Sequence, residues 1–220
     1  MNVYLVPAAA GRHELYCEVA SHAQADETGA GSLRERLVNG FNRMVAEGEA
    51  AVHGHGHDAP ERGRLRRFIT RRVAEAVAEQ RLLWHLRHET AVRLIHPNDL
   101  PASNATAIAT SLIGADYAKH RRWCIIDGLI AAITGPLFFF VPGPNVVSWY
   151  FAFRAVGHFF AMRGAYQGLS GTMWTAAPSA ELTALRAALV LDHETRSRRV
   201  DEIATALGLN RLSWFVEKIA

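Results

Sequence analysis

Cysteine is nearly absent from this sequence, and so is lysine. The two cysteines, Cys17 and Cys124, form neither a CxxC pair nor the spaced set of a secreted disulfide framework. A reducing compartment is therefore expected. Of the 24 basic residues only Lys119 and Lys218 are lysines. We interpret this arginine bias as the mark of a GC-rich coding sequence and draw no chemistry from it.

Motifs of enzymes are also missing. The sequence contains no Gly-rich phosphate loop, no nucleophile elbow and no HExxH pair, so we expect neither an enzyme nor a cofactor. The first residues lack a positive n-region, and Pro7 interrupts their short apolar run, so no signal peptide is expected. The early acids Glu14 and Glu18 argue against a mitochondrial transit peptide.

Charge is missing from one long stretch. No Asp, Glu, Lys or Arg occurs between Gly128 and Phe153, although charged residues make up 20% of the chain. A single straight helix is excluded there, because Pro142 and Pro144, on either side of Gly143, remove backbone donors and restrict the residues before them. We therefore predict two short apolar helices, at about 125–141 and 146–162, joined by a turn at Pro142, Gly143, Pro144 and Asn145. Pro136 is expected to kink the first helix or to end it early.

The rest of the chain predicts a mainly α fold, a helical bundle with a small N-terminal β-hairpin. NVYLV and ELYCEV are rich in strand-forming residues and flank a Gly-containing turn. Apolar residues at helical spacing predict helices at 33–51, 61–95, 103–122, 179–199 and 200–219. TAAPSAEL, before the helix at 179–199, is expected to be a loop. We divide the chain into a β-hairpin (1–20), an amphipathic helical region (21–122), the apolar helical hairpin (123–169) and C-terminal helices (170–220).

The apolar hairpin has two interpretations. Basic residues flank it, namely Lys119, Arg121 and Arg122 before it and Arg163 after the second helix, whereas its turn is uncharged. Under the positive-inside rule this pattern predicts a membrane hairpin with both termini cytoplasmic. The alternative is a buried hairpin at the centre of a soluble helical domain, because segments this short can also be core helices.

Ionisable residues inside such a hairpin are candidate functional groups. Arg154 and His158 are four residues apart and share one face of the second helix. Asp127 lies at about the same distance from the turn on the first helix. We predict an intramembrane charge cluster of Asp127, Arg154 and His158. In the alternative, Asp127 reaches the headgroups and Arg154 snorkels towards water.

Small residues recur at four-residue spacing along the second helix and beyond it. This spacing permits close approach of helices in lipid. The predicted packing residues are Gly157, Ala161, Gly164, Ala165 and Gly168.

Two further patterns carry weaker hypotheses. His53, His55 and His57 could bind a metal ion, although a solvated Gly-rich loop explains them better and no cysteine lies nearby. Residues 200–219 resemble a helix-turn-helix, which leaves open a soluble helical interaction protein that binds DNA. The apolar residues Leu212 and Trp214 in the second helix argue against DNA binding, so a nucleic-acid partner is not expected.

Together, two segments resemble the mitochondrial K⁺–H⁺ exchange-related family. They are MNVYLVP with RHELYCEV at the start, and RRWCIIDGLIAAITGPLFFFVPGPNVVSWYFAFRAVGHFFAMRGAYQGL later. The specific part covers about residues 119–170, where the PxPN turn, the aromatic WY pair, the arginine of FAFR and a helix of small residues with a histidine occur together.

The resemblance implies a membrane-associated protein linked to electroneutral potassium–proton exchange and to ion and volume homeostasis. Eukaryotic members are associated with the mitochondrial inner membrane. Whether members carry ions or regulate a carrier is not implied. Without a transit peptide, this chain is expected to be a bacterial member at the cytoplasmic membrane. Two short helices are few for an exchanger, so a homo-oligomer or a cation–proton carrier partner is expected beside the lipid bilayer.

Overall fold

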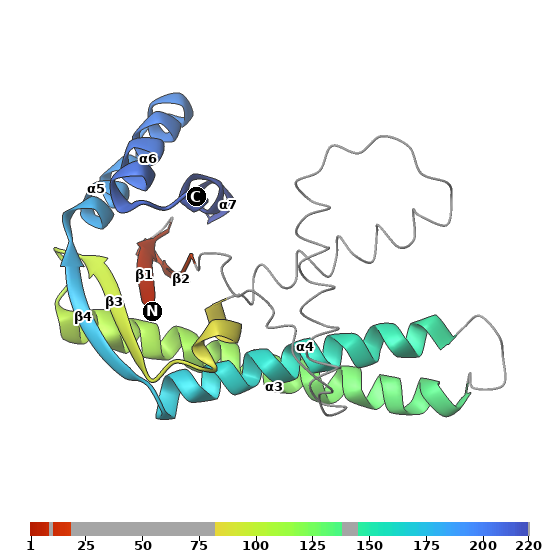
Figure 1. Cartoon of the computed structure of the whole chain (residues 1–220). Coiled ribbons are helices and arrows are strands. Elements are labelled where there is room, and N and C mark those ends of the chain that lie inside the picture. Colours follow the sequence, from red (N-terminus) through yellow and green to blue (C-terminus); the bar gives the residue numbers. More distant parts are fainter. Residues whose placement is uncertain (9–10, 19–81, 138–144, 220) are drawn as a thin grey trace, which may run out of the picture. The chain divides into compact units, whose positions relative to one another are not determined.

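The computed structural model describes residues 1–8, 11–18, 82–137 and 145–219. The chain divides into two compact units, Met1–Glu18 with Leu82–Ala220, and Val19–Arg81. The described residues belong to the first unit, which is mainly helical (Figure 1). The helices predicted at 33–51 and over most of 61–95 lie outside the described residues.

A four-stranded sheet organises the first unit. Its strands are β1 (Asn2–Pro7), β2 (His13–Tyr16), β3 (Ala91–Pro97) and β4 (Met173–Ser179), in the order β2-β1-β3-β4. β1 and β2 pair antiparallel, which confirms the N-terminal hairpin, and Gly11 in its turn has a φ of 72°. β3 pairs parallel with both β1 and β4. The hairpin is thus half of a larger sheet.

Two sequence predictions are wrong at this sheet. The helix expected to run to residue 95 ends early, because residues 82–86 are helical while Ala91–Pro97 form β3. Val92 and Leu94 are buried on one face of β3, whereas Ala91 and Arg93, which alternate with them, are exposed, as expected for a strand with one face in the core. The loop expected at TAAPSAEL is largely β4, and Pro178 is tolerated because β4 lies at the edge of the sheet.

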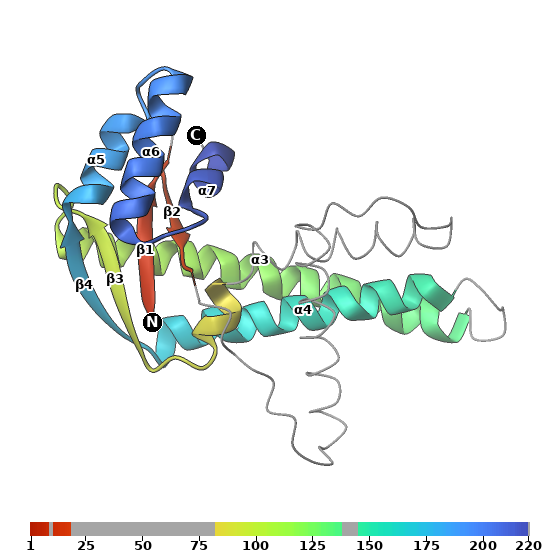
Figure 2. The same ribbon diagram turned by 45° about the horizontal axis from the view of Figure 1, so that its top comes forward.

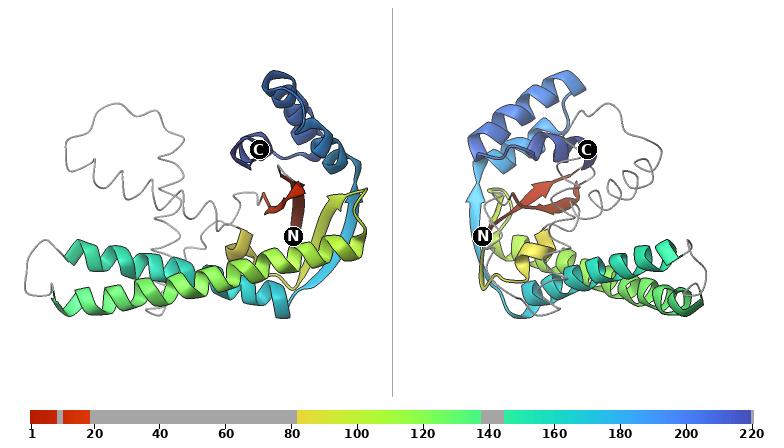
Figure 3. Two further views of the ribbon diagram at one scale, coloured as in Figure 1. Left: turned by 180° about the vertical axis from the view of Figure 1, so that it is seen from behind. Right: turned by 45° about the vertical axis from the view of Figure 1, so that its right-hand side comes forward.

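Two long helices connect β3 to β4. α3 (Ala102–Leu137) and α4 (Asn145–Ser170) lie side by side as an antiparallel pair, and their far ends extend beyond the sheet (Figure 3). The helix predicted at 103–122 therefore continues without a break into the apolar hairpin. Pro136 lies in the last turn of α3, and Asn145 is the first residue of α4. Pro142, Gly143 and Pro144 lie outside the described residues.

Three short helices follow β4. They are α5 (Ala180–Ala188), α6 (His193–Leu207) and α7 (Leu212–Ile219). The single helix predicted at 179–199 is wrong, because Asp192 caps the start of α6 by accepting a hydrogen bond from the Thr195 backbone at 3.0 Å. The helix pair expected at 200–219 is present as the end of α6 and α7.

The sheet is covered on both faces. Tyr4 and Val6 of β1 pack into a core with α5, α6 and α7, while Val3 and Leu5 point to the other face, since side chains alternate along a strand. α3 contacts the sheet, and Figure 2 shows it on the side away from α5–α7. The helical pair is thus anchored at its base to a packed α/β layer structure.

Candidate functional site: a polar cluster inside the α3–α4 helix pair

A hydrogen bond from a side chain to the backbone joins the distal parts of the two helices. The Ser148 hydroxyl donates to the carbonyl of Ala131 at 3.1 Å. Gly135 makes room for this contact, because a Cβ there would lie 3.3 Å from Ser148 Oγ. α3 and α4 therefore approach closely along the part that the sequence predicts to be apolar.

Three charged or ionisable side chains meet between the helices. The Asp127 carboxylate Oδ2 lies 3.3 Å from Arg154 Nε and 3.6 Å from His158 Nε2. Asp127 is 1% exposed, so its side chain points to α4 and away from the surface. The residues predicted as a cluster from helix spacing are thus neighbours in space.

Arg154 also packs on aromatic rings. Its guanidinium carbon lies 5.7 Å from the ring centroid of Trp123 and 5.7 Å from that of Tyr150. Such cation–π contacts offset part of the cost of removing a guanidinium from water. The arginine is thereby held over the helix pair, beside Asp127.

His120 is a fourth member of the cluster, and sequence reasoning missed it. Its Nδ1 lies 2.9 Å from Nδ1 of His158, and it is 4% exposed. Burial, together with the neighbouring His158 and Lys119, lowers the pKa of His120 to about 4, so the ring is neutral at pH 7. Its position seven residues before Asp127, two turns along the same helix face, was the signal available in the sequence.

The surface of the distal helix pair is apolar. Large hydrophobic side chains are exposed there, among them Leu129 at 58%, Ile133 at 66% and Trp149 at 71%. The others are Ile125, Ile126, Leu137, Val156 and Phe159. Charges are thus turned inward and apolar groups outward, the reverse of the usual arrangement in water. Within the described ranges, no helix combines the length and the apolarity that crossing a membrane requires.

The predicted small packing residues lie at the base of the pair. Ala161 and Ala165 are fully buried, and Gly157 is half-buried. Gly164 and Gly168 are buried against residues 82–86: an added Cβ would lie 1.6 Å from the Leu83 carbonyl oxygen and 2.4 Å from Leu86 Cδ2, respectively. These glycines therefore let residues 82–86, which precede β3, pack closely against α4. The four-residue spacing of the small residues did not indicate which segment would pack there.

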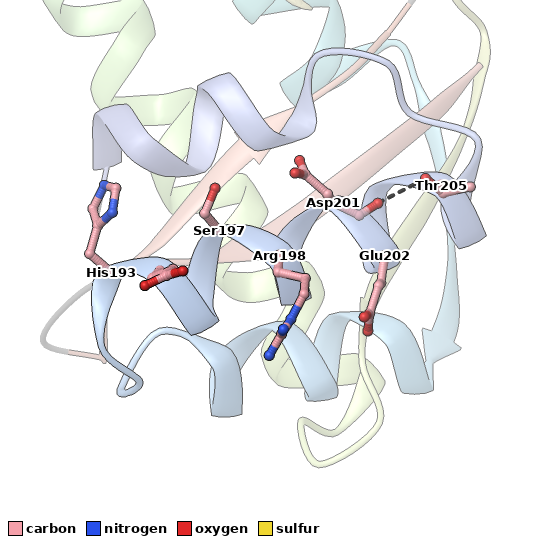
Figure 4. A pocket seen from close by; sticks show the side chains of 7 residues that line it. His193, Ser197, Arg198, Asp201, Glu202 and Thr205 are labelled. Carbon is pink, nitrogen blue, oxygen red and sulfur yellow. Dashed lines mark hydrogen bonds between the residues drawn. The ribbon is translucent and has the colours of Figure 1, made fainter.

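Two other places are poorer candidates. Among the described residues no group of three or more metal-binding side chains occurs, and His53, His55 and His57 lie outside those residues. A shallow region on α6 is lined by His193, Glu194, Ser197, Arg198, Asp201, Glu202 and Thr205. Figure 4 shows that these side chains all come from one side of one helix. It is an open, solvated helix surface.

Comparison with known proteins agrees with the resemblance seen in the sequence. Residues 2–169 match the family described as mitochondrial K⁺–H⁺ exchange-related. The chain belongs to this family. The match runs from β1 to the end of α4 and so includes His120, Asp127, Arg154 and His158. Neither the curated proteins nor the solved structures gave a match.

Proposed function

We propose that this chain is a membrane-associated component or regulator of potassium–proton exchange. In this proposal the distal α3–α4 pair is embedded in the cytoplasmic membrane of a bacterium, and both termini stay on the cytoplasmic side. The sheet and helices α5–α7 form a base at the membrane surface. The membership of the K⁺–H⁺ exchange-related family supports the link to exchange.

The observation that carries the membrane part is the reversed polarity of the helix pair. Exposed apolar side chains such as Ile133 and Leu137 gain on the order of 1–2 kcal/mol each when they move from water into hydrocarbon. Asp127, inside, is paired with Arg154 and His158, as ionisable groups in a low-dielectric medium need to be. Basic residues at positions 119, 121 and 122 stand where the anionic headgroups would be.

The size of the helix pair favours a component over a self-contained carrier. From Trp123 to Leu137 a helix is about 22 Å long, which is less than the roughly 30 Å of a hydrocarbon core. A pathway for K⁺ needs more oxygen ligands than two such helices supply. We therefore propose that the chain acts with further copies of itself or with a cation–proton carrier. No enzymatic activity and no cofactor enter this proposal.

The test is potassium-dependent proton flux in inverted membrane vesicles, from bacterial cells with and without this chain. Flux should rise when the chain is present, and Asp127→Asn should remove the increase. Asp201→Asn, at an exposed carboxylate on α6, is the matched control and should leave the flux unchanged. Equal flux with and without the chain, at verified protein levels, would overturn the proposed link to exchange.

A further inference from the structure

One ring connects two buried groups in the helix pair. His158 presents Nδ1 to Nδ1 of His120 at 2.9 Å, and Nε2 to Oδ2 of Asp127 at 3.6 Å. An imidazole can accept a proton at one nitrogen and release the other proton from the second. His158 is therefore placed as a bridge between His120 and Asp127.

The environment of the Asp127 carboxylate favours its protonation. Asp127 is 1% exposed, and its Oδ2 makes no hydrogen bond of normal geometry with any described residue, although Arg154 Nε lies 3.3 Å away. A buried carboxylate oxygen left without a hydrogen bond costs free energy, which protonation or a shared proton would relieve. With 1% exposure, Asp127 has almost no direct contact with solvent, so a neighbouring side chain is the nearer proton donor.

The starting state follows from the charges. Two imidazolium ions cannot stand 2.9 Å apart at low cost, and burial lowers the pKa of His120 to about 4, so a neutral pair is favoured near pH 7, with one N–H between the two Nδ1 atoms. While Asp127 is ionised, the favoured tautomer of His158 carries its proton on Nε2, facing the carboxylate. His158 Nδ1 then accepts the hydrogen bond that His120 Nδ1–H donates.

We propose that His120, His158 and Asp127 form a relay that carries one proton to Asp127. The proton enters at His120, on the side of the cluster where Lys119 lies. A proton binds Nε2 of His120; the proton on His120 Nδ1 moves to Nδ1 of His158; and the proton on His158 Nε2 moves to Asp127. The relay ends with two neutral imidazoles in the opposite tautomers and a neutral carboxylic acid. No proton is created or lost, and the charge of the cluster rises by the one proton taken up.

The charged groups around the relay disfavour a proton that stays on either histidine ring. On α3, Lys119 precedes His120 and Cys124 lies between His120 and Asp127; on α4, Arg154 flanks Asp127. Arg87, from the segment before β3, stacks over the Phe160 ring at 4.6 Å. The cationic groups discourage a lasting imidazolium, so the proton passes through the rings without staying. The use of this proton in exchange rests on the proposed function, whereas the relay itself does not.

The test follows proton arrival at Asp127 in purified full-length protein in lipid nanodiscs. After a jump from about pH 7.5 to about pH 4.5, infrared spectroscopy should detect a carboxylic C=O band that Asp127→Asn lacks. His158→Gln should slow the rise of this band at least about tenfold, since positioned acid–base groups contribute factors of this size or more. His193→Gln, at an exposed histidine of α6, should keep the wild-type rate.

A second measurement uses the wild-type protein and therefore tests the relay even if His158→Gln does not fold. In wild-type protein with ¹⁵N-labelled histidine, NMR should show a ¹⁵N–¹⁵N coupling across the His120–His158 hydrogen bond, with the His158 proton on Nε2. Independent titration of both rings near pH 6.5, or equal band kinetics in the wild type and folded His158→Gln, would overturn the relay. A relay that passes both tests without any potassium-dependent flux would overturn the proposed function alone.

Discussion

Asp127 of α3 and Arg154 of α4 form an ion pair, with Oδ2 and Nε 3.3 Å apart, in which the carboxylate is 1% exposed and the arginine 34%. The pair joins two helices that residues 138–144 connect along the chain. Such a pair costs desolvation, and the loss of one partner leaves the other without compensation. Its coupling is therefore measurable.

Asp127→Asn should lower the free energy of unfolding by about 1–3 kcal/mol, less than for a fully buried pair because Arg154 is partly exposed. Arg154→Leu in the same chain should restore part of the loss. Chemical denaturation of the four variants gives the coupling energy. The exposed pair Arg199–Glu202 on α6 is the control, expected to couple by no more than about 0.5 kcal/mol. Additive effects at Asp127 and Arg154 would contradict the pair.

The two glycines against residues 82–86 should differ in their tolerance of alanine. At Gly164 the new Cβ meets a backbone carbonyl, so we expect a loss of about 3 kcal/mol or more; at Gly168 it meets the end of the Leu86 side chain, and the loss should be about 1–2 kcal/mol. Gly114→Ala, where a Cβ meets nothing within 4 Å, should stabilise α3 by about 0.5–1 kcal/mol. Thermal unfolding of the three alanine variants gives the order of their stabilities. A Gly164→Ala protein as stable as the wild type would refute the close approach.

Low pH should destabilise the fold through His120. Its pKa in the folded protein is about 4, below the ordinary 6.5, so between these values the unfolded chain binds a proton that the folded chain does not. Stability from this histidine is complete above about pH 6.5 and is lost as the pH falls towards 4. The loss should be on the order of 1–3 kcal/mol. The free energies of unfolding of the wild type and His120→Gln, measured by chemical denaturation at each pH, should converge as the pH falls. The free energy of unfolding of His193→Gln should follow that of the wild type. Parallel curves for wild type and His120→Gln would show that His120 is not the group.

The helix pair and its polar cluster were predictable because they depend on local periodicity. Arg154 and His158 share a face by their spacing, and Asp127 follows from counting back from the turn. The same spacing would have placed His120 on the face of Asp127. Family resemblance then supplied what periodicity cannot, the link to potassium–proton exchange, and the match to residues 2–169 bears out that resemblance.

The sheet was predictable only in its local half. β1 and β2 form a hairpin with partners close in sequence, whereas β3 pairs with β4 across the whole of α3 and α4. A short apolar run such as AVRLIHP does not distinguish a buried strand from the end of a helix until its partner is known. The close packing of Gly164 against Leu83 could not be predicted from the sequence for the same reason, since the two residues are far apart along the chain. Contacts between distant segments are set by the assembled fold.

The central claim is that the distal helix pair enters the bilayer, and alkaline carbonate washing of bacterial membranes tests it most directly. Wild-type protein should stay in the membrane pellet. Leu129→Glu with Ile133→Glu, which puts two charges on the exposed apolar surface, should move into the wash, because each charge costs about 2.5–3.5 kcal/mol in hydrocarbon. Val190→Glu, at an apolar side chain 85% exposed between α5 and α6, should stay in the pellet. Wild-type protein in the wash, or a folded double variant that remains in the pellet, would contradict the account.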